Sequence, residues 1–162
     1  MAKFTSIFRK ILIGLGVLLV LIQFVPFGRS HTNPPTIAEP QWDSPQTRET
    51  FFRSCGDCHS NQMVWPWYSN VAPVSWLVQY DVEEGRSHLN VSEWGRRKND
   101  ADEAVEEVES GAMPYPPYLL LHPSARLSDN EKAAFLQGLK NTFGQKREAD
   151  EHEAESESEE RN

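Results

Sequence analysis

Residues 55–59 read Cys-Gly-Asp-Cys-His and contain both cysteines of this 162-residue chain. C-x-x-C-H is the attachment pattern of c-type haem, in which each thiol bonds to one vinyl group of the porphyrin. The two residues between the cysteines allow both sulfur atoms to reach one edge of the ring, and the adjoining histidine then ligates the iron. The spacing therefore predicts one covalent haem c on Cys55 and Cys58, with His59 as the proximal ligand.

Two other kinds of site use a C-x-x-C pair. A thioredoxin-type dithiol lies at a strand-to-helix turn within a βαβ pattern, and no such pattern surrounds these cysteines. Structural zinc needs four nitrogen or sulfur ligands, and the sequence offers no second Cys or Cys/His pair. Covalent haem is therefore the favoured interpretation, with a dithiol or another metal as alternatives.

The N-terminal residues 1–27 predict a membrane anchor. Residues 11–27 are apolar apart from one Gln and one Pro, and they follow Lys3, Arg9 and Lys10. A helix of this length covers about 25 Å, close to the ~30 Å hydrocarbon core. No small-x-small cleavage site ends the run, so we favour an uncleaved anchor over a removed signal peptide. The basic flank predicts a single-pass protein of the inner membrane whose remaining residues are periplasmic.

Composition divides the rest of the chain into three parts. Residues 28–45 are rich in proline and small polar residues and are predicted to form a linker. Residues 46–144 are expected to form one helical domain. Residues 145–162 are mostly Glu, Ser and Asp, which predicts a disordered acidic tail. The formal net charge is −8, and no basic patch indicates a nucleic-acid partner.

Hydrophobic periodicity within residues 46–144 predicts an all-α domain. Helices are expected over residues 46–58, 73–85, 100–110 and 128–144. Gly111 is the expected C-cap of the third helix, and Ser128 with Glu131 forms a capping box for the fourth. The predicted buried positions are Phe51, Phe52 and Cys55; Val74, Leu77, Val78 and Val82; Ala101, Ala104, Val105 and Val108; and Phe135, Leu136, Leu139 and Phe143. Trp42, in the linker, is a candidate to pack on this domain.

The second axial position of the iron has four candidate ligands. Met63 follows His59 too closely to reach the opposite side of the porphyrin, and His88 ends an amphipathic helix among charges. Met113 is preferred because a thioether suits haem iron and the prolines after it stiffen its loop. A core methionine that fills a gap is the alternative role for Met113. His122 is the rival distal ligand.

Several separated motifs resemble known haem proteins. The order of a helix, C-x-x-C-H, an aromatic loop, further helices, a Met-Pro loop and a capped C-terminal helix is similar to the class I cytochrome c plan. More narrowly, the chain resembles the bacterial haem-binding domain family in five motifs, at residues 55–61 (CGDCHSN), 65–68 (WPWY), 72–76 (APVSW), 92–94 (SEW) and 113–114 (MP). Those are small cytochrome-c-like proteins, often with an N-terminal membrane anchor. The resemblance spans about residues 46–143.

The resemblance implies covalent haem on Cys55 and Cys58 and proximal ligation by His59. Met113 as distal ligand follows only by analogy with the Met-Pro loop of cytochromes. The aromatic residues Trp65, Trp67 and Tyr68, together with Pro114, are candidates to wall a haem pocket. The aromatic cluster would equally serve to pack a core around a turn.

A membrane-anchored monohaem protein of this kind is expected to carry single electrons outside the cytoplasm, without a catalytic residue. One alternative is a haem-based sensor or ligand-binding module with a labile distal site. Another is a peroxidase-like enzyme, which needs an open distal face and a polar group such as His122. The sequence does not identify a redox partner protein.

Overall fold

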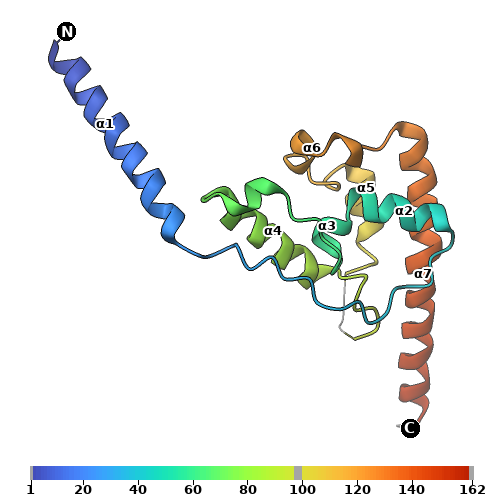
Figure 1. The fold of residues 1–162 in the computed structure, drawn as a ribbon. Coiled ribbons are helices and arrows are strands. Elements are labelled where there is room, and N and C mark those ends of the chain that lie inside the picture. Colours follow the sequence, from blue (N-terminus) through green and yellow to red (C-terminus); the bar gives the residue numbers. More distant parts are fainter. Residues whose placement is uncertain (1, 97–99, 161–162) are drawn as a thin grey trace. The chain divides into compact units, whose positions relative to one another are not determined.

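The computed structural model describes residues 2–96 and 100–160, with side chains described for residues 6–96 and 100–144. The chain forms two compact units, the first from Met1–Thr32 and Val64–Glu83, the second from Asn33–Met63 and Glu84–Asn162. Within the described ranges all regular elements are helices (Figure 1), and a single isolated bridge pairs Ala38 with Glu93. The all-α class is therefore confirmed.

The first unit begins with α1 (Ala2–Leu21) and the short 3-10 helix η1 (Ile22–Phe24). The stretch Ser6–Phe24 has a mean hydropathy of 2.1, and none of it is buried. It is long and apolar enough to cross a membrane. This unit also contains η2 (Trp67–Asn70) and the first part of α4 (Val74–His88), which continues into the second unit.

Two segments far apart in sequence are tied together within the first unit. The Gln23 amide donates to the carbonyl of Ala72 at 2.8 Å and accepts from its N–H at 3.0 Å. The His31 ring stacks on Trp65 with centroids 4.5 Å apart. Gly28, at φ +76°, lies against the backbone of the first turn of α4, where a Cβ would overlap. Residues 64–83 therefore group with the N-terminal segment in the first unit.

The second unit holds the main apolar core. Its helices are α2 (Pro45–Ser54), α3 (Gly56–His59), α5 (Ala104–Ser110), α6 (Tyr118–Leu121), η3 (Pro123–Ala125) and α7 (Asp129–Glu160). Both α2 and α5 contact α7 (Figure 1). The apolar cluster between them consists of Phe51, Leu89, Val91, Ala101, Val108, Phe135, Leu139 and Phe143. Trp42 packs against it with its ring 5.1 Å from Phe51, as expected. Of the buried positions predicted for these helices, Phe51, Val108, Phe135, Leu139 and Phe143 are buried, whereas Phe52, Cys55, Ala104, Val105 and Leu136 are partly buried.

Capping residues mark where these helices begin and end. The hydroxyl of Ser44 accepts from the Thr47 N–H at 3.1 Å and caps α2. The capping box of α7 is present, since the Ser128 N–H donates to the Glu131 carboxylate at 2.9 Å. Gly111 closes α5 in the left-handed conformation at φ +83°. The last two features match the sequence-based expectation.

Four helix boundaries differ from the prediction. The first domain helix is interrupted at Cys55, because that residue adopts φ −129° and separates α2 from α3. The third predicted helix begins at Ala104 instead of residue 100. α4 continues through Gly85 to His88. α7 does not end at Gly144 but continues to Glu160, since residues 145–160 contain good helix formers and no proline. The backbone of the predicted disordered tail is helical there.

The buried side of α4 also differs from the prediction. Ser75 and Val82 are buried, whereas Val74 and Leu77 are exposed. The apolar residues of this helix are not confined to one side of it, so periodicity alone does not select which side faces inward.

Candidate haem site

The attachment motif lies on one short helical turn at the edge of the apolar cluster. The Cys55 N–H donates to the carbonyl of Phe51 at 2.7 Å, which joins the motif to the end of α2. The N–H groups of Cys58 and His59 both donate back to the Cys55 carbonyl, at 3.2 Å and 3.0 Å. Neither cysteine takes part in a disulfide bond. The turn therefore presents two sulfur atoms and one imidazole from five consecutive residues.

The His59 ring is oriented by a backbone carbonyl. Its Nδ1 lies 3.0 Å from the oxygen of Leu89, just beyond the end of α4. Because a carbonyl only accepts, this contact requires the proton on Nδ1 and leaves the lone pair on Nε2. Burial lowers the pKa of His59, and the Leu89 carbonyl opposes this effect in part. A neutral imidazole with its other nitrogen bonded to a second group is the form in which histidine ligates metals.

The last turn of α4 packs directly on the motif at Gly85. A Cβ at this position would lie 2.7 Å from the carbonyl oxygen of Cys58 and 2.9 Å from its Cβ. The Val91 N–H donates to the carbonyl of His59 at 3.0 Å, and the Arg86 guanidinium donates to that of Ser60 at 2.9 Å. Residues 85–91 thus support the motif from one side.

The environment of the cysteines disfavours the two alternative sites. Burial, with a smaller contribution from Cys58, raises the pKa of Cys55 to about 12. A thiol exchanging disulfides needs a lowered pKa instead. Within the described residues no group of three or more His, Cys, Asp or Glu side chains is arranged to hold a metal ion.

Met113 lies in the second unit at the edge of the same cluster that Cys55 borders. Its N–H donates to the carbonyl of Glu107 at 2.9 Å, and a cis peptide bond joins it to Pro114. Met63 is buried, and its carbonyl accepts from the Asn33 amide at 2.8 Å. The structure thus brings Cys55 and Met113 to one core, while ligation by Met113 stays a prediction.

His122 is connected to the motif through Tyr118. The two rings stack with centroids 3.9 Å apart, and the Nδ1 of His122 lies 3.1 Å from the Tyr118 carbonyl. The Tyr118 hydroxyl donates to the carboxylate of Asp57 at 2.8 Å. Asp57 lies between the two cysteines, so α6 is held against the attachment helix. His88, in contrast, is exposed between Asp100 and Glu84.

The aromatic residues predicted to wall a haem pocket belong to the first unit. Trp65 stacks on His31, and Trp67 packs edge-on against Tyr68 with centroids 5.9 Å apart. Trp67 is largely exposed. Their role at the haem stays a prediction.

Three supporting positions escaped the sequence analysis. The acceptor at Leu89 is a backbone atom and has no sequence signal. The hydrogen bond from Tyr118 to Asp57 joins positions 61 residues apart and likewise leaves none. Gly85 did carry a signal, because a glycine inside a helical pattern can have a packing reason as well as mark a helix end.

Residues 17–141 match the model of a protein family described as a haem-binding domain. The chain belongs to this family. No curated protein and no solved structure matches it. The matched segment begins within α1, ends within α7 and includes the motif, so haem binding is shown at the level of the family. The donor set of Cys55, Cys58 and a His59 ring oriented by the Leu89 carbonyl fits this group.

Proposed function

We propose that this haem-binding protein carries one covalent haem c and transfers single electrons outside the cytoplasm, held to the inner membrane by α1. The observation that carries the proposal is the motif turn, which holds two cysteines outside any disulfide bond and a histidine whose Nδ1 bonds to the carbonyl of Leu89. The sulfur atoms of Cys55 and Cys58 suit thioether attachment, and Nε2 of His59 suits ligation of the iron.

Each residue at the site then has a supporting role. The hydrogen bond from His59 to Leu89 fixes the ring and raises its basicity as a ligand. The apolar cluster beside Cys55 excludes water. Met113 is the proposed distal ligand, with His122 as its rival. When bound, haem supplies one-electron Fe(II)/Fe(III) chemistry. No residue in this scheme acts as an acid, base or nucleophile, so we propose a carrier and not an enzyme.

Haem retention after denaturation tests covalent attachment. Full-length protein made with c-type maturation should keep its haem through acid-acetone extraction and give a haem-stained band in a denaturing gel. Cys55→Ser/Cys58→Ser should lose that band. His59→Ala serves as the matched control, because it should retain the stained band while its spectrum changes. Haem that is extracted from the wild-type protein would contradict the proposal.

The visible spectrum distinguishes a carrier from a sensor. A six-coordinate, low-spin haem that binds carbon monoxide slowly supports electron transfer. A five-coordinate haem that binds carbon monoxide at once would favour a ligand-binding module or a peroxidase-like enzyme.

A further inference from the structure

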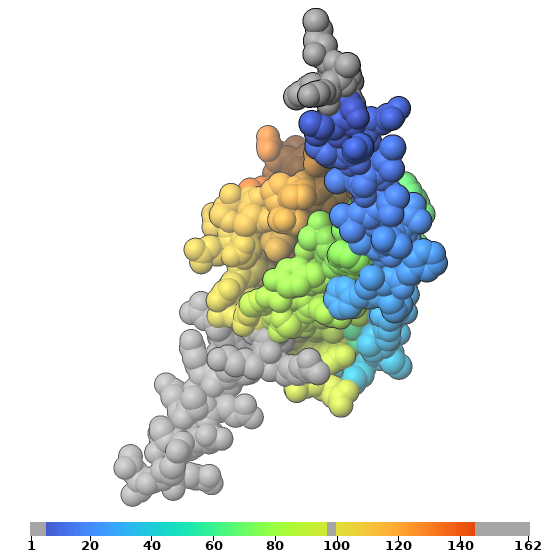
Figure 2. Space-filling view, turned by 90° about the vertical axis from the view of Figure 1, so that its left-hand side faces the viewer, coloured from blue at the N-terminus to red at the C-terminus, as the bar shows by residue number. Residues whose placement is uncertain are grey.

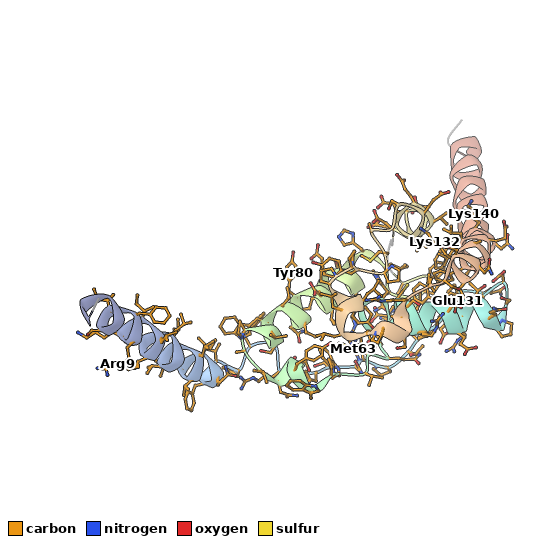
Figure 3. All side chains as sticks on the ribbon, turned by 90° about the horizontal axis from the view of Figure 1, so that it is seen from above. Arg9, Met63, Tyr80, Glu131, Lys132 and Lys140 are labelled. Carbon is orange, nitrogen blue, oxygen red and sulfur yellow. The ribbon has the colours of Figure 1, made fainter. Side chains whose placement is uncertain are left out.

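The first unit exposes a set of large apolar side chains that do not pack into its interior. Val74, Leu77 and Tyr80 follow one another at a spacing of three on the outer side of α4, and Figure 3 shows Tyr80 pointing away from the ribbon. Trp67 and Val71 precede them and are also exposed, Trp67 to 78%. We call these five side chains the apolar face.

The sequence around the apolar face carries no charge. Residues 60–80 contain no Asp, Glu, Lys or Arg, and the first charge after them is Asp81. Five of the nine Trp and Tyr residues of the chain lie in this stretch. Exposed apolar surface without charges is unusual where a protein faces only water. Trp and Tyr are enriched where proteins meet the headgroup layer of a membrane.

The apolar face is attached to the end of the membrane-spanning helix. The Gln23 side chain, within the stretch Ser6–Phe24, makes two hydrogen bonds with the backbone of Ala72. The Arg29 guanidinium donates to the Gln23 carbonyl at 2.8 Å and to its side-chain oxygen at 3.1 Å, which braces the same junction. In Figure 2 the green residues of α4 lie alongside the blue segment that follows α1. The apolar face therefore begins at the level where the apolar span ends.

The dimensions agree with the thickness of the headgroup layer. Val74 and Tyr80 are six positions apart, so the helical part of the apolar face extends at most about 9 Å from that level. The headgroup layer is about 5–8 Å thick on each side of the hydrocarbon core. Charged residues begin again at Asp81, close to the distance at which the helix would leave this layer.

We propose that the apolar face lies in the headgroup layer of the bilayer that α1 spans, as a second point of lipid contact. This inference rests on the proposed membrane anchoring by α1. Trp67 and Tyr80 would sit at the interface, and Val71, Val74 and Leu77 would contact the upper acyl chains. The chemistry that recognises this surface is a neutral lipid interface, because no cation other than Arg29 lies near the junction with Gln23 in the described part of the first unit.

Lipid photolabelling tests the proposal on the intact protein. Full-length, haem-loaded protein is placed in phosphatidylcholine vesicles that carry a diazirine near the headgroup. After illumination the labelled residues are located by fragment-ion mass spectrometry. We expect label on α1 and on residues 67–80. Leu120 and Leu121 of α6, which are 75% and 64% exposed, are an internal control of equal apolarity and should stay at background.

A charge on the apolar face should remove it from the lipid. In Trp67→Glu/Leu77→Glu the label on residues 67–80 should fall about tenfold, equivalent to about 1.4 kcal/mol, while α1 stays labelled. Leu120→Glu/Leu121→Glu is the matched control and should leave the pattern unchanged. Leu77→Glu alone provides a milder variant if the double variant fails to fold, and its label should fall in the same direction.

The remaining outcomes would overturn the proposal. Label on α1 but none on residues 67–80 would mean that haem, protein or water covers the apolar face. A changed haem spectrum in Trp67→Glu would then identify haem as the occupant. Absence of label on α1 would remove the anchoring on which the inference rests. Haem retention is scored separately on the same samples, so loss of the covalent haem would contradict the proposed function and leave the lipid contact standing.

Discussion

Met113 and His122 lie at the two ends of one proline-rich segment and differ in what holds them. Met113 packs at the edge of the apolar cluster, whereas His122 is stacked on Tyr118. A thioether beside the core is available to a haem attached at Cys55 without breaking a described hydrogen bond. This difference favours Met113 as the distal ligand.

Met113→Ala should therefore remove the sixth ligand of the haem iron and leave that coordination position vacant. We expect loss of the near-infrared methionine-to-Fe(III) band and fast binding of carbon monoxide. The reduction potential should fall by roughly 0.1–0.2 V, part of the ~0.8 V range that axial ligands span. His122→Ala is the control and should keep the band and the potential. The reverse pattern in the two variants would indicate bis-histidine coordination, and no change in either would indicate an open distal site.

Gly85 should tolerate no side chain. In Gly85→Ala the new Cβ would lie 2.7 Å from the Cys58 carbonyl oxygen, so α4 or the motif has to move. We expect the free energy of unfolding to fall by about 1–3 kcal/mol, together with a lower yield of covalent haem. Gly144→Ala is the matched control, because nothing lies within 4 Å of that position in α7. Denaturant unfolding of both variants measures the effect, and a Gly85→Ala protein as stable as wild type would refute the close contact.

At the scale of elements, α6 is fixed to the attachment helix α3 by one side-chain hydrogen bond. Tyr118→Phe removes the donor to Asp57 and should cost about 0.5–1.5 kcal/mol of stability. Because Tyr118 ends the segment that starts at Met113, hydrogen exchange should accelerate at Met113, Tyr115 and Tyr118, the residues of this segment that have an amide hydrogen. Tyr115→Phe, in the same segment, should change neither quantity. Asp57→Asn keeps an acceptor oxygen and should restore most of the loss expected for Asp57→Ala; equal effects of the two would argue against the bond.

The end of α4 should make stability depend on pH. Hydrogen bonds to Asp100 and then Glu84 raise the pKa of His88 above its ordinary value. A raised folded-state pKa gives stability that is fully present below the unfolded value near 6.5 and is lost as pH rises through the folded value. The contribution of His88 to the free energy of unfolding should thus decrease as pH rises above about 6.5. His88→Gln should flatten this slope in urea titrations, and an unchanged slope would assign it to another group.

At the scale of the whole molecule, the sequence predicts the helices whose apolar residues all lie on one side, because such a helix can bury only that side. Helices α2, α5 and α7 each carry large apolar side chains on one side, so the burial of Phe51, Val108 and Phe135 is predictable from the sequence. Cys55, Cys58 and His59 are placed by spacing alone, since a helical turn brings such residues together.

The division into two units was not predictable in the same way. Within the first unit the Gln23 side chain bonds to the backbone at Ala72, 49 residues away. A polar residue inside an apolar run indicates that something must satisfy its amide, but not which segment does so. The buried side of α4 was not predicted for a related reason. Ser75 lies on that side and is buried, although its polarity suggests an exposed position.

The acceptor for the His59 ring has a consequence for how this protein can change over time. The oxygen of Leu89 belongs to the main chain, and every one of the twenty amino acids supplies it. Substitutions at position 89 therefore alter packing but leave the partner of the imidazole in place. A lineage, or a laboratory selection, that needs a different reduction potential has no simple route through this bond. Adaptive substitutions should collect instead in residues 113–118, which contain Met113, the proposed distal ligand, because there the side chains and not the main chain would determine the ligation.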